Sequence, residues 1–362
     1  MKRIGLSVLA LTLWTSSALA QTPAPAPAAP STEIGGLVDV YYDFYSTKTD
    51  GQYRNFDTKH NQFAMTMAQV WLAKAPSESS RVGFKFKLNF GPASSNFIHA
   101  FEPGGTPYNN IQEAYISYLA PVGKGLQLDA GVFVTPHGAE VIEAKDNANY
   151  SRGLLFALAI PYYHSGVRMS YAAADKVTVM AGITNGWNNI VDNNTGKTVV
   201  GGVTIKPTSA VSIVGQYMTG PEKTGTNDDW RHLFDGIVTA AVNDKMTFTA
   251  NYDYGREKFG TSSVSWQGLA AYLKMQATPT VAFTPRFEFF NDADGFATGQ
   301  AQKLKELTGT LELKAADNLQ WRLEFRRDWS DQDVFVNSKG DAKGYQSSVG
   351  FGLLYSFAGK IQ

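Results

Sequence analysis

The chain has 362 residues, with 32 Lys plus Arg, 32 Asp plus Glu and no cysteine. This balanced charge argues against a nucleic-acid-binding protein, and the lack of cysteine excludes disulfide scaffolds, Cys-ligated zinc and thiol nucleophiles. The mean hydropathy of −0.21 excludes a bundle of membrane-spanning helices, because each such helix needs about 20 consecutive apolar residues.

The N-terminus has the pattern of an export signal. Lys2 and Arg3 precede an apolar stretch over residues 4–14, and Ala18-Leu19-Ala20 fits a small-x-small cleavage site. A membrane anchor is the less favoured alternative, because the apolar stretch is too short to span a bilayer. We therefore predict a signal peptide over residues 1–20, a Pro/Ala-rich periplasmic tether over 21–32, and a folded domain over 33–362.

The folded domain shows a period of two rather than a helical period. In the segment RVGFKFKLNF, residues 81–90, apolar and polar side chains alternate, and the same holds for residues 246–254. This pattern predicts sixteen strands: 33–46, 61–74, 81–91, 110–120, 126–136, 162–173, 177–188, 198–207, 210–220, 231–242, 246–256, 264–277, 281–291, 304–315, 319–330 and 345–357.

The connections between these strands alternate in length. Short segments rich in Pro, Gly, Asp and Asn read as tight turns. The longer loops all fall at the opposite strand ends, at residues 47–60, 92–109, 137–161, 189–197, 221–230, 257–263, 292–303 and 331–344. This alternation indicates an up-and-down antiparallel barrel with both termini on the turn side.

Aromatic residues cluster at the two ends of the predicted strands. The loop-end group is Tyr42, Phe44, Trp187, Trp230, Tyr254, Phe289, Trp329 and Tyr345, and the turn-end group is Trp71, Tyr118, Tyr171, Tyr272, Trp321 and Phe357. A soluble β-sandwich or propeller would have no need of two such belts, whereas a barrel crossing a bilayer places aromatic rings at both interfaces. The predicted fold class is all-β, a closed antiparallel transmembrane β-barrel of about 16 strands with short periplasmic turns and longer extracellular loops.

The segment of residues 131–171 carries three motifs. They are G-x-F-x-T-P-x-G-x-E, N-x-x-Y-S-R-x-x-x-F and P-x-x-H-x-G-V-R, which begin at Gly131, Asn147 and Pro161. Together with residues 286–335, they resemble the β-barrel porin-2 family, the OmpL-like barrels of the Gram-negative outer membrane. The resemblance implies a pore-forming protein in that membrane. One departure is that Phe357, the expected terminal aromatic residue, is followed by Ala-Gly-Lys-Ile-Gln.

No motif for catalysis or cofactor binding is present in the sequence. The hydrolase patterns G-x-S-x-G and H-E-x-x-H are missing, and the five histidines lack metal-ligand spacing. Asp292-Ala293-Asp294-Gly295 lacks the further ligands of a calcium loop and reads as a turn. We therefore expect no enzyme activity, no metal and no cofactor.

The inward face of the strands should line an aqueous lumen, because sixteen strands enclose more space than side chains fill. The candidate pore-lining residues are Arg81, Lys85, Lys87, His164, Arg168, Arg286, Glu288, Glu312, Lys314, Arg322, Glu324 and Arg326. The plainer interpretation is that each of these side chains solvates a polar wall and pairs with a neighbour across strands.

The longest predicted loop, 137–161, mixes charged residues with the apolar run 154–160. An apolar run exposed on a loop is unfavourable in water, so we expect the loop to fold back into the barrel and narrow it. Glu140, Glu143, Asp146 and Arg152 would then form the constriction, with the loop carboxylates opposing the wall cations across an aqueous gap and setting up a transverse field. The alternative is a loop that folds outward as a lid.

These patterns favour an outer-membrane porin for passive diffusion of small hydrophilic solutes or ions. The alternatives are a barrel enzyme of the lipase or protease type and a surface receptor or adhesin. Expected partners are outer-membrane lipid, lipopolysaccharide and the solutes themselves, with no nucleic acid. A homo-oligomer, a trimer by analogy with other sixteen-stranded porins, is also expected.

Overall fold

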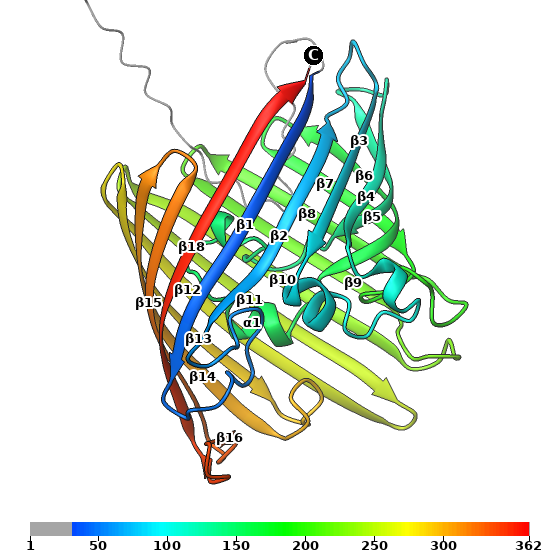
Figure 1. The fold of residues 1–362 in the computed structure, drawn as a ribbon. Coiled ribbons are helices and arrows are strands. Elements are labelled where there is room, and N and C mark those ends of the chain that lie inside the picture. The colour runs from blue at the N-terminus through cyan, green and yellow to red at the C-terminus, as the bar shows by residue number, and fades with distance from the viewer. Residues whose placement is uncertain (1–30, 362) are drawn as a thin grey trace, which may run out of the picture.

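The computed structural model describes residues 31–361, and sixteen of its strands close into one antiparallel barrel (Figure 1). The predicted signal peptide and nearly all of the tether lie outside the described residues. The barrel strands are β1 (Thr32–Tyr45), β2 (Phe63–Lys74), β3 (Val82–Phe90), β4 (Ile111–Ala120), β5 (Leu126–Val134), β6 (Tyr163–Ala174), β7 (Val177–Thr184), β8 (Thr198–Thr208), β9 (Val211–Pro221), β10 (Trp230–Asn243), β11 (Met246–Phe259), β12 (Ser262–Thr278), β13 (Val281–Asp292), β14 (Gln302–Ala316), β15 (Leu319–Ser330) and β18 (Tyr345–Ile361).

Each barrel strand pairs with its neighbours in the sequence, and the first strand closes the barrel against the last. β1 pairs with β18 from Thr32 opposite Ile361 to Tyr45 opposite Ser348. Closure leaves no sheet edge, so every strand can satisfy its backbone hydrogen bonds within the barrel. The predicted sixteen-strand barrel is confirmed, and Figure 1 shows its short turns at the top and its longer loops at the bottom.

Most strand boundaries differ from the prediction by a few residues; the strand predicted over 177–188, for example, ends at Thr184. Two differences also change what a segment was predicted to be. The segment 257–263 is not a loop, because β11 and β12 stay paired up to Phe259 opposite Ser262. Polar residues and glycine suggested a loop there, but a strand that rises above the lipid also carries polar residues. The residues after Phe357 are part of β18, where they pair with the start of β1.

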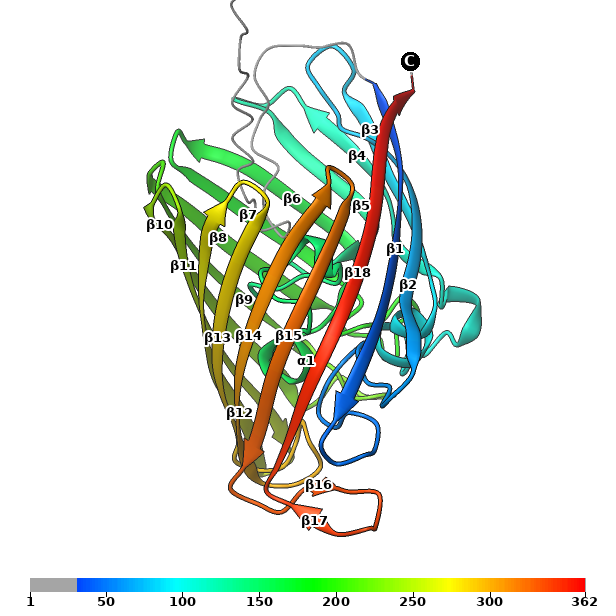
Figure 2. The same ribbon diagram turned by 60° about the vertical axis from the view of Figure 1, so that its left-hand side comes forward.

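Short elements occupy the longer loops. They are the helical turns η1 (Ala93–Ile98), η2 (Thr106–Tyr108) and η3 (Ala144–Asp146), the helix α1 (Leu154–Leu158), and a hairpin of β16 (Phe335–Val336) and β17 (Ala342–Lys343). The hairpin lies beyond the barrel rim in Figure 2. Within residues 31–361, the structure holds no helix with the length and apolar character needed to cross a membrane.

Side chains along the strands alternate between the outer face and the lumen. On β13, Phe283 and Phe287 are exposed on the outer face, while Arg286 and Glu288 are buried inside. The period of two in the sequence therefore sorts apolar residues toward lipid and charged residues toward the interior. Tyr272 is a correction to the predicted turn-end belt, because it faces inward and its hydroxyl donates to Glu288 at 3.1 Å.

Candidate functional site: the barrel interior

The loop of residues 135–162, which joins β5 to β6, enters the barrel. Its helix α1 contacts β12, β13 and β14 from the inside, and both ribbon views place α1 within the barrel (Figures 1 and 2). Lys145 of the same loop reaches a cavity of about 690 Å³ near the short turns, which it lines together with Asp317 and Ser356. We call residues 135–162 the inner loop; it extends from the loop-end rim toward the short turns.

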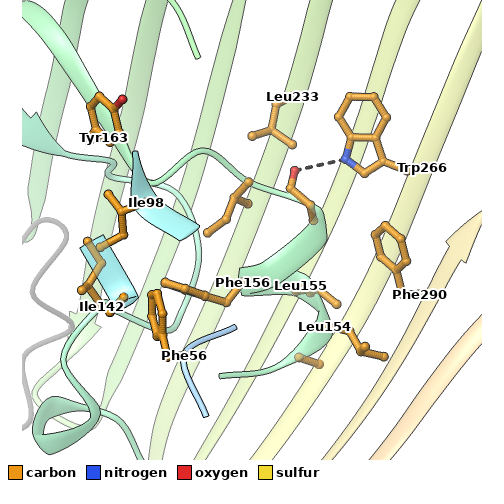
Figure 3. Packing of buried hydrophobic residues seen from close by; sticks show 14 of the residues in the cluster. Phe56, Ile98, Ile142, Leu154, Leu155, Phe156, Tyr163, Leu233, Trp266 and Phe290 are labelled. Carbon is orange, nitrogen blue, oxygen red and sulfur yellow. Dashed lines mark hydrogen bonds between the residues drawn. The ribbon is translucent and has the colours of Figure 1, made fainter. Parts of the chain in front are cut away.

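The apolar run of the inner loop is buried against the barrel wall. Leu154 and Leu155 of α1 belong to one buried apolar cluster with Trp266 and Phe290 of the wall (Figure 3). The indole Nε1 of Trp266 donates to the carbonyl of Ala159 at 3.1 Å. Burying each large apolar side chain contributes roughly 1.5–3 kcal/mol, which favours the inward position of the loop over exposure to water.

Two further loops pack against the inner loop inside the barrel. Phe56 comes from the loop between β1 and β2, and Phe97 and Ile98 come from the loop between β3 and β4. The ring of Phe56 meets Phe97 at a centroid distance of 5.6 Å and Phe156 at 5.8 Å, both edge to face. Three loops thus contribute to one buried apolar cluster, part of which is drawn in Figure 3.

Three buried arginines of the wall bind the backbone of the inner loop. Arg322 donates to the carbonyls of Ala144 and Asn149, each at 2.7 Å, and to that of Asn147 at 2.9 Å. Arg286 donates to the carbonyl of Ser151 at 2.6 Å, and Arg326 to that of Arg152 at 2.6 Å. We call Arg286, Arg322 and Arg326 the arginine clamp, because they satisfy loop carbonyls that the fold has removed from water.

Two wall carboxylates bind the N–H groups of the same loop. Glu324 accepts from the backbone of Tyr150 at 2.8 Å and of Ser151 at 3.1 Å. Glu288 accepts from the backbone of Leu154 and Leu155. A Cβ at Gly153 would collide with the Glu288 carboxylate, so a larger residue there would displace the carboxylate from the N–H groups of Leu154 and Leu155.

Glu140 and Glu143 of the inner loop form ion pairs with the wall. Glu140 contacts the Arg286 guanidinium at 2.7 Å, and Glu143 contacts the Lys87 ammonium at 2.7 Å. Burial opposes ionisation of Glu143, but the positive charges of Lys87 and Lys145 and the hydrogen bonds to the carboxylate outweigh it and lower its pKa. Glu143 therefore keeps its negative charge inside the barrel.

Asp146 and Arg152 take different positions in the inner loop. Asp146 is paired with Lys145 at 2.8 Å and remains more than one-third exposed. Arg152 is buried, with its guanidinium 4.6 Å above the Phe56 ring, where a cation and an aromatic face attract each other. Arg152 thus belongs to the buried cluster and does not face an open gap.

Comparison with known proteins shows which family this barrel belongs to. The sequence model of the family described as "Putative beta-barrel porin-2, OmpL-like" matches residues 31–357. The chain belongs to this porin-2 family. It is a porin-type barrel of the Gram-negative outer membrane. A search of curated proteins found no match.

Several solved structures share the fold of this porin-2 barrel. OmpT of Vibrio cholerae in its trimer form has a TM-score of 0.62 at 12% identity, covering 91% of this chain and 100% of that one. The anion-selective porin of Comamonas acidovorans has a TM-score of 0.61 at 9% identity, covering 91% and 100%. The channel DcaP of Acinetobacter baumannii has a TM-score of 0.59 at 14% identity, covering 90% and 97%. At these identities the likeness is one of fold.

The predicted pore-lining residues of the porin-2 barrel fall into two groups. Members of the first group are buried between the wall and the loops: His164, Arg286, Glu288, Glu312, Arg322, Glu324 and Arg326. Members of the second group keep part of their surface free: Arg81, Lys85, Lys87, Arg168 and Lys314. The first group is enclosed by other protein groups, whereas members of the second group, such as Lys85 and Arg168, contact protein groups and keep part of their surface exposed.

The expected transverse field across an aqueous gap requires correction. Glu140 and Arg286 are in direct contact and both are buried, so no water separates the loop acid from this wall cation. The arginine clamp binds loop carbonyls in the same way. The sequence indicated which residues face inward, but not that the loop would lie directly against them.

Sequence reasoning missed the wall acids that complete the ion pairs. Glu306 contacts Arg286 at 2.7 Å, Asp328 contacts Arg326 at 2.6 Å, and Asp129 contacts Arg168 at 3.0 Å. Glu306 and Asp328 lie on the same strand faces as Glu312 and Arg326, at the period of two. Extending that alternation toward the loop end would have found them.

The histidines of the porin-2 barrel form no metal site, and no group of His, Asp and Glu among residues 31–361 has the geometry to hold an ion. His137 of the inner loop is buried, with its Nδ1 3.2 Å from the Thr135 hydroxyl. Burial, and secondarily the nearby His164, lowers the pKa of His137 to about 3. Its imidazole is therefore neutral at neutral pH.

Proposed function

We propose that this chain is an outer-membrane channel for passive diffusion of small hydrophilic solutes or ions, with residues 135–162 as its constriction. The main support for this proposal is a set of buried contacts. Through them the arginine clamp, Glu288 and Glu324 hold the inner loop inside the barrel. A loop held at so many points narrows the lumen without closing the turn-end half.

The proposed roles follow from exposure. Lys85, Lys87 and Arg168, and Lys314 on the opposite side of the barrel, keep part of their surface free toward the lumen and would line the path. Glu140 and Glu143 would fix the loop at the constriction through their pairs with Arg286 and Lys87. Arg81 donates to the carbonyl of Leu119 at 3.0 Å and would stiffen the short-turn rim.

The proposed function is non-catalytic. A hydrolase would need an accessible nucleophile in contact with a base. Ser151, the buried serine of the inner loop, lies 3.0 Å from Arg286. His164 lies between the Thr135 hydroxyl and the carbonyl of Gly186. These contacts favour structural roles for Ser151 and His164 over the alternative of a barrel enzyme.

Lipid and lipopolysaccharide would surround the outward apolar face, where Phe283, Leu323 and Phe325 are exposed.

The proposal includes a homo-oligomer, a trimer by analogy with the trimer form of OmpT. Chemical cross-linking of the protein in outer-membrane vesicles would test it. A ladder that ends at three chains supports the trimer, and a single uncross-linked band contradicts it.

Reconstitution tests the proposed channel. The folded protein, added to a planar bilayer at low concentration, should produce discrete conductance steps. Liposomes that contain it should swell in a monosaccharide and remain stable in a large oligosaccharide, because the inner loop restricts the passage. A heat-unfolded sample serves as the control. Folded protein that inserts into the bilayer without conductance steps would contradict the proposal.

A further inference from the structure

Five partly exposed cations surround the lumen in its middle and short-turn part. Lys85 and Lys87 lie on β3, Arg168 on β6, Lys274 on β12 and Lys314 on β14. In the strand order around the barrel, β6 lies opposite β14, and β3 lies nearly opposite β12. We call these five residues the lumen cations; their strands lie on both sides of the barrel.

Four of the lumen cations contact carboxylates of the wall or the inner loop. Lys85 lies 2.8 Å from Glu113, Arg168 lies 3.0 Å from Asp129, and Lys274 lies 3.5 Å from Glu312. Lys87 lies 2.7 Å from Glu143 and 3.5 Å from Glu113. Lys314 is two residues from Glu312 and so shares its inward face.

The cation is the more exposed partner in each of these pairs. The side chain of Lys85 is 30% exposed and that of Glu113 is 3% exposed. The exposed fraction of the side chain is 16% for Arg168 and 3% for Asp129, and it is 12% for Lys274 and 4% for Glu312. Each carboxylate therefore lies behind its cation, and the charge that a solute in the lumen meets first is positive.

The inner loop contributes one pair of the opposite kind. The Asp146 side chain is 39% exposed against 24% for its partner Lys145. Asp146 is neutralised at 2.8 Å by Lys145, and two further carboxylates, Glu33 and Asp317, are exposed at the short-turn cavity, so the lumen cations outnumber the exposed carboxylates five to three. The charges most exposed in the short-turn half of the lumen are therefore mainly positive, and low-dielectric walls strengthen the potential of such charges.

We propose that the short-turn half of the lumen is a binding vestibule for small organic anions with carboxylate or phosphate groups. This proposal rests on the proposed channel function and assigns its substrate class. A carboxylate entering from the short-turn side would meet ammonium and guanidinium donors on facing strands, and would form charge-assisted hydrogen bonds that a neutral sugar cannot form. The channel would consequently pass anions better than cations.

The test compares a triple variant with a matched control. Lys85→Gln, Lys274→Gln and Lys314→Gln are combined, because Glu113 keeps Lys87 and Glu312 keeps Arg322 as partners. The control combines Lys258→Gln, Lys339→Gln and Lys343→Gln, which removes the same charge from exposed positions outside the lumen. Reversal potentials are measured in a KCl gradient, and the block of chloride current by millimolar citrate is measured on the same channels.

The wild type and the control should prefer chloride to potassium, and citrate should reduce their current. The triple variant should lose at least half of this preference and most of the citrate block. A conducting wild type that prefers potassium, or a triple variant that matches the control, would overturn the anion vestibule and leave the channel function standing. If the triple variant gives no channels, Lys314→Gln alone is compared with Lys339→Gln. Equal citrate block in these two single variants would overturn the anion vestibule. Failure of the wild type to conduct would instead overturn the channel function.

Discussion

At the scale of single residues, the arginine clamp connects the wall to the inner loop. Arg322 is fully buried and serves three loop carbonyls as well as Glu312. Removing a buried ionic partner costs more than the pair itself contributes, because the remaining charge and carbonyls stay out of water without a donor. The clamp therefore makes the position of the loop sensitive to single substitutions.

We predict that Arg322→Met lowers the free energy of unfolding by about 3 kcal/mol and exposes the inner loop to proteolysis. The physical reason is that the carbonyls of Ala144, Asn147 and Asn149 lose their donor. Urea unfolding in lipid vesicles and trypsin cleavage after Lys145 or Arg152 measure the two effects.

The matched control for this prediction is Arg327→Met on the same strand. Arg327 faces outward and lies 4.1 Å from the Tyr345 ring centroid, without contact to the inner loop. The control should remain resistant to cleavage within the loop. Equal trypsin cleavage in Arg322→Met and Arg327→Met would contradict the clamp.

At the scale of elements, the two faces of each strand meet different surroundings. On β3, Phe86 points to lipid and is exposed in the isolated chain, whereas Lys85 points to the lumen and pairs with Glu113. We predict that Phe86→Arg lowers the free energy of unfolding by about 2–4 kcal/mol, since lipid near the middle of the bilayer disfavours charge. Urea unfolding of the folded barrel in vesicles measures it.

The neighbouring variant Lys85→Gln is the control and should cost less than about 1 kcal/mol, because it keeps a polar group in a polar lumen. Equal destabilisation by both variants would show that the assignment of the two faces of β3 is wrong.

A polar replacement at Leu354 should be more harmful than at other lumen-facing positions. Leu354 packs with Tyr41, Ala144 and Tyr150, so a polar replacement there would disturb the inner loop.

The strands could be predicted from the sequence because alternation is a local property of each strand. The inward fold of the inner loop was expected from its apolar run alone. The residues that hold it were not, since Arg322 and Asn147 are 175 positions apart. Contacts of this kind depend on how far the loop reaches into a closed barrel, and no local pattern encodes that depth.

At the scale of the whole molecule, the wall is a closed barrel, and the proposed channel function assigns the selection of solutes to the loops inside it. The wall alone would leave an aqueous lumen, as sixteen strands do. The inner loop fills part of that lumen with an apolar cluster and leaves the partly exposed lysines and Arg168 toward the short turns. In the proposed channel, residues 135–162 would therefore determine most of the path.

Single-channel conductance tests this central claim most directly. One variant replaces residues 139–159 with a short Gly-Ser linker, which removes the inner loop but keeps both strand ends. The control deletes residues 338–340, at the exposed end of the β16–β17 hairpin beyond the rim. We predict that the linker variant conducts at least twice as much current per channel as the wild type, and that the control conducts as the wild type does. An unchanged conductance in the linker variant would contradict the claim that the inner loop forms the constriction.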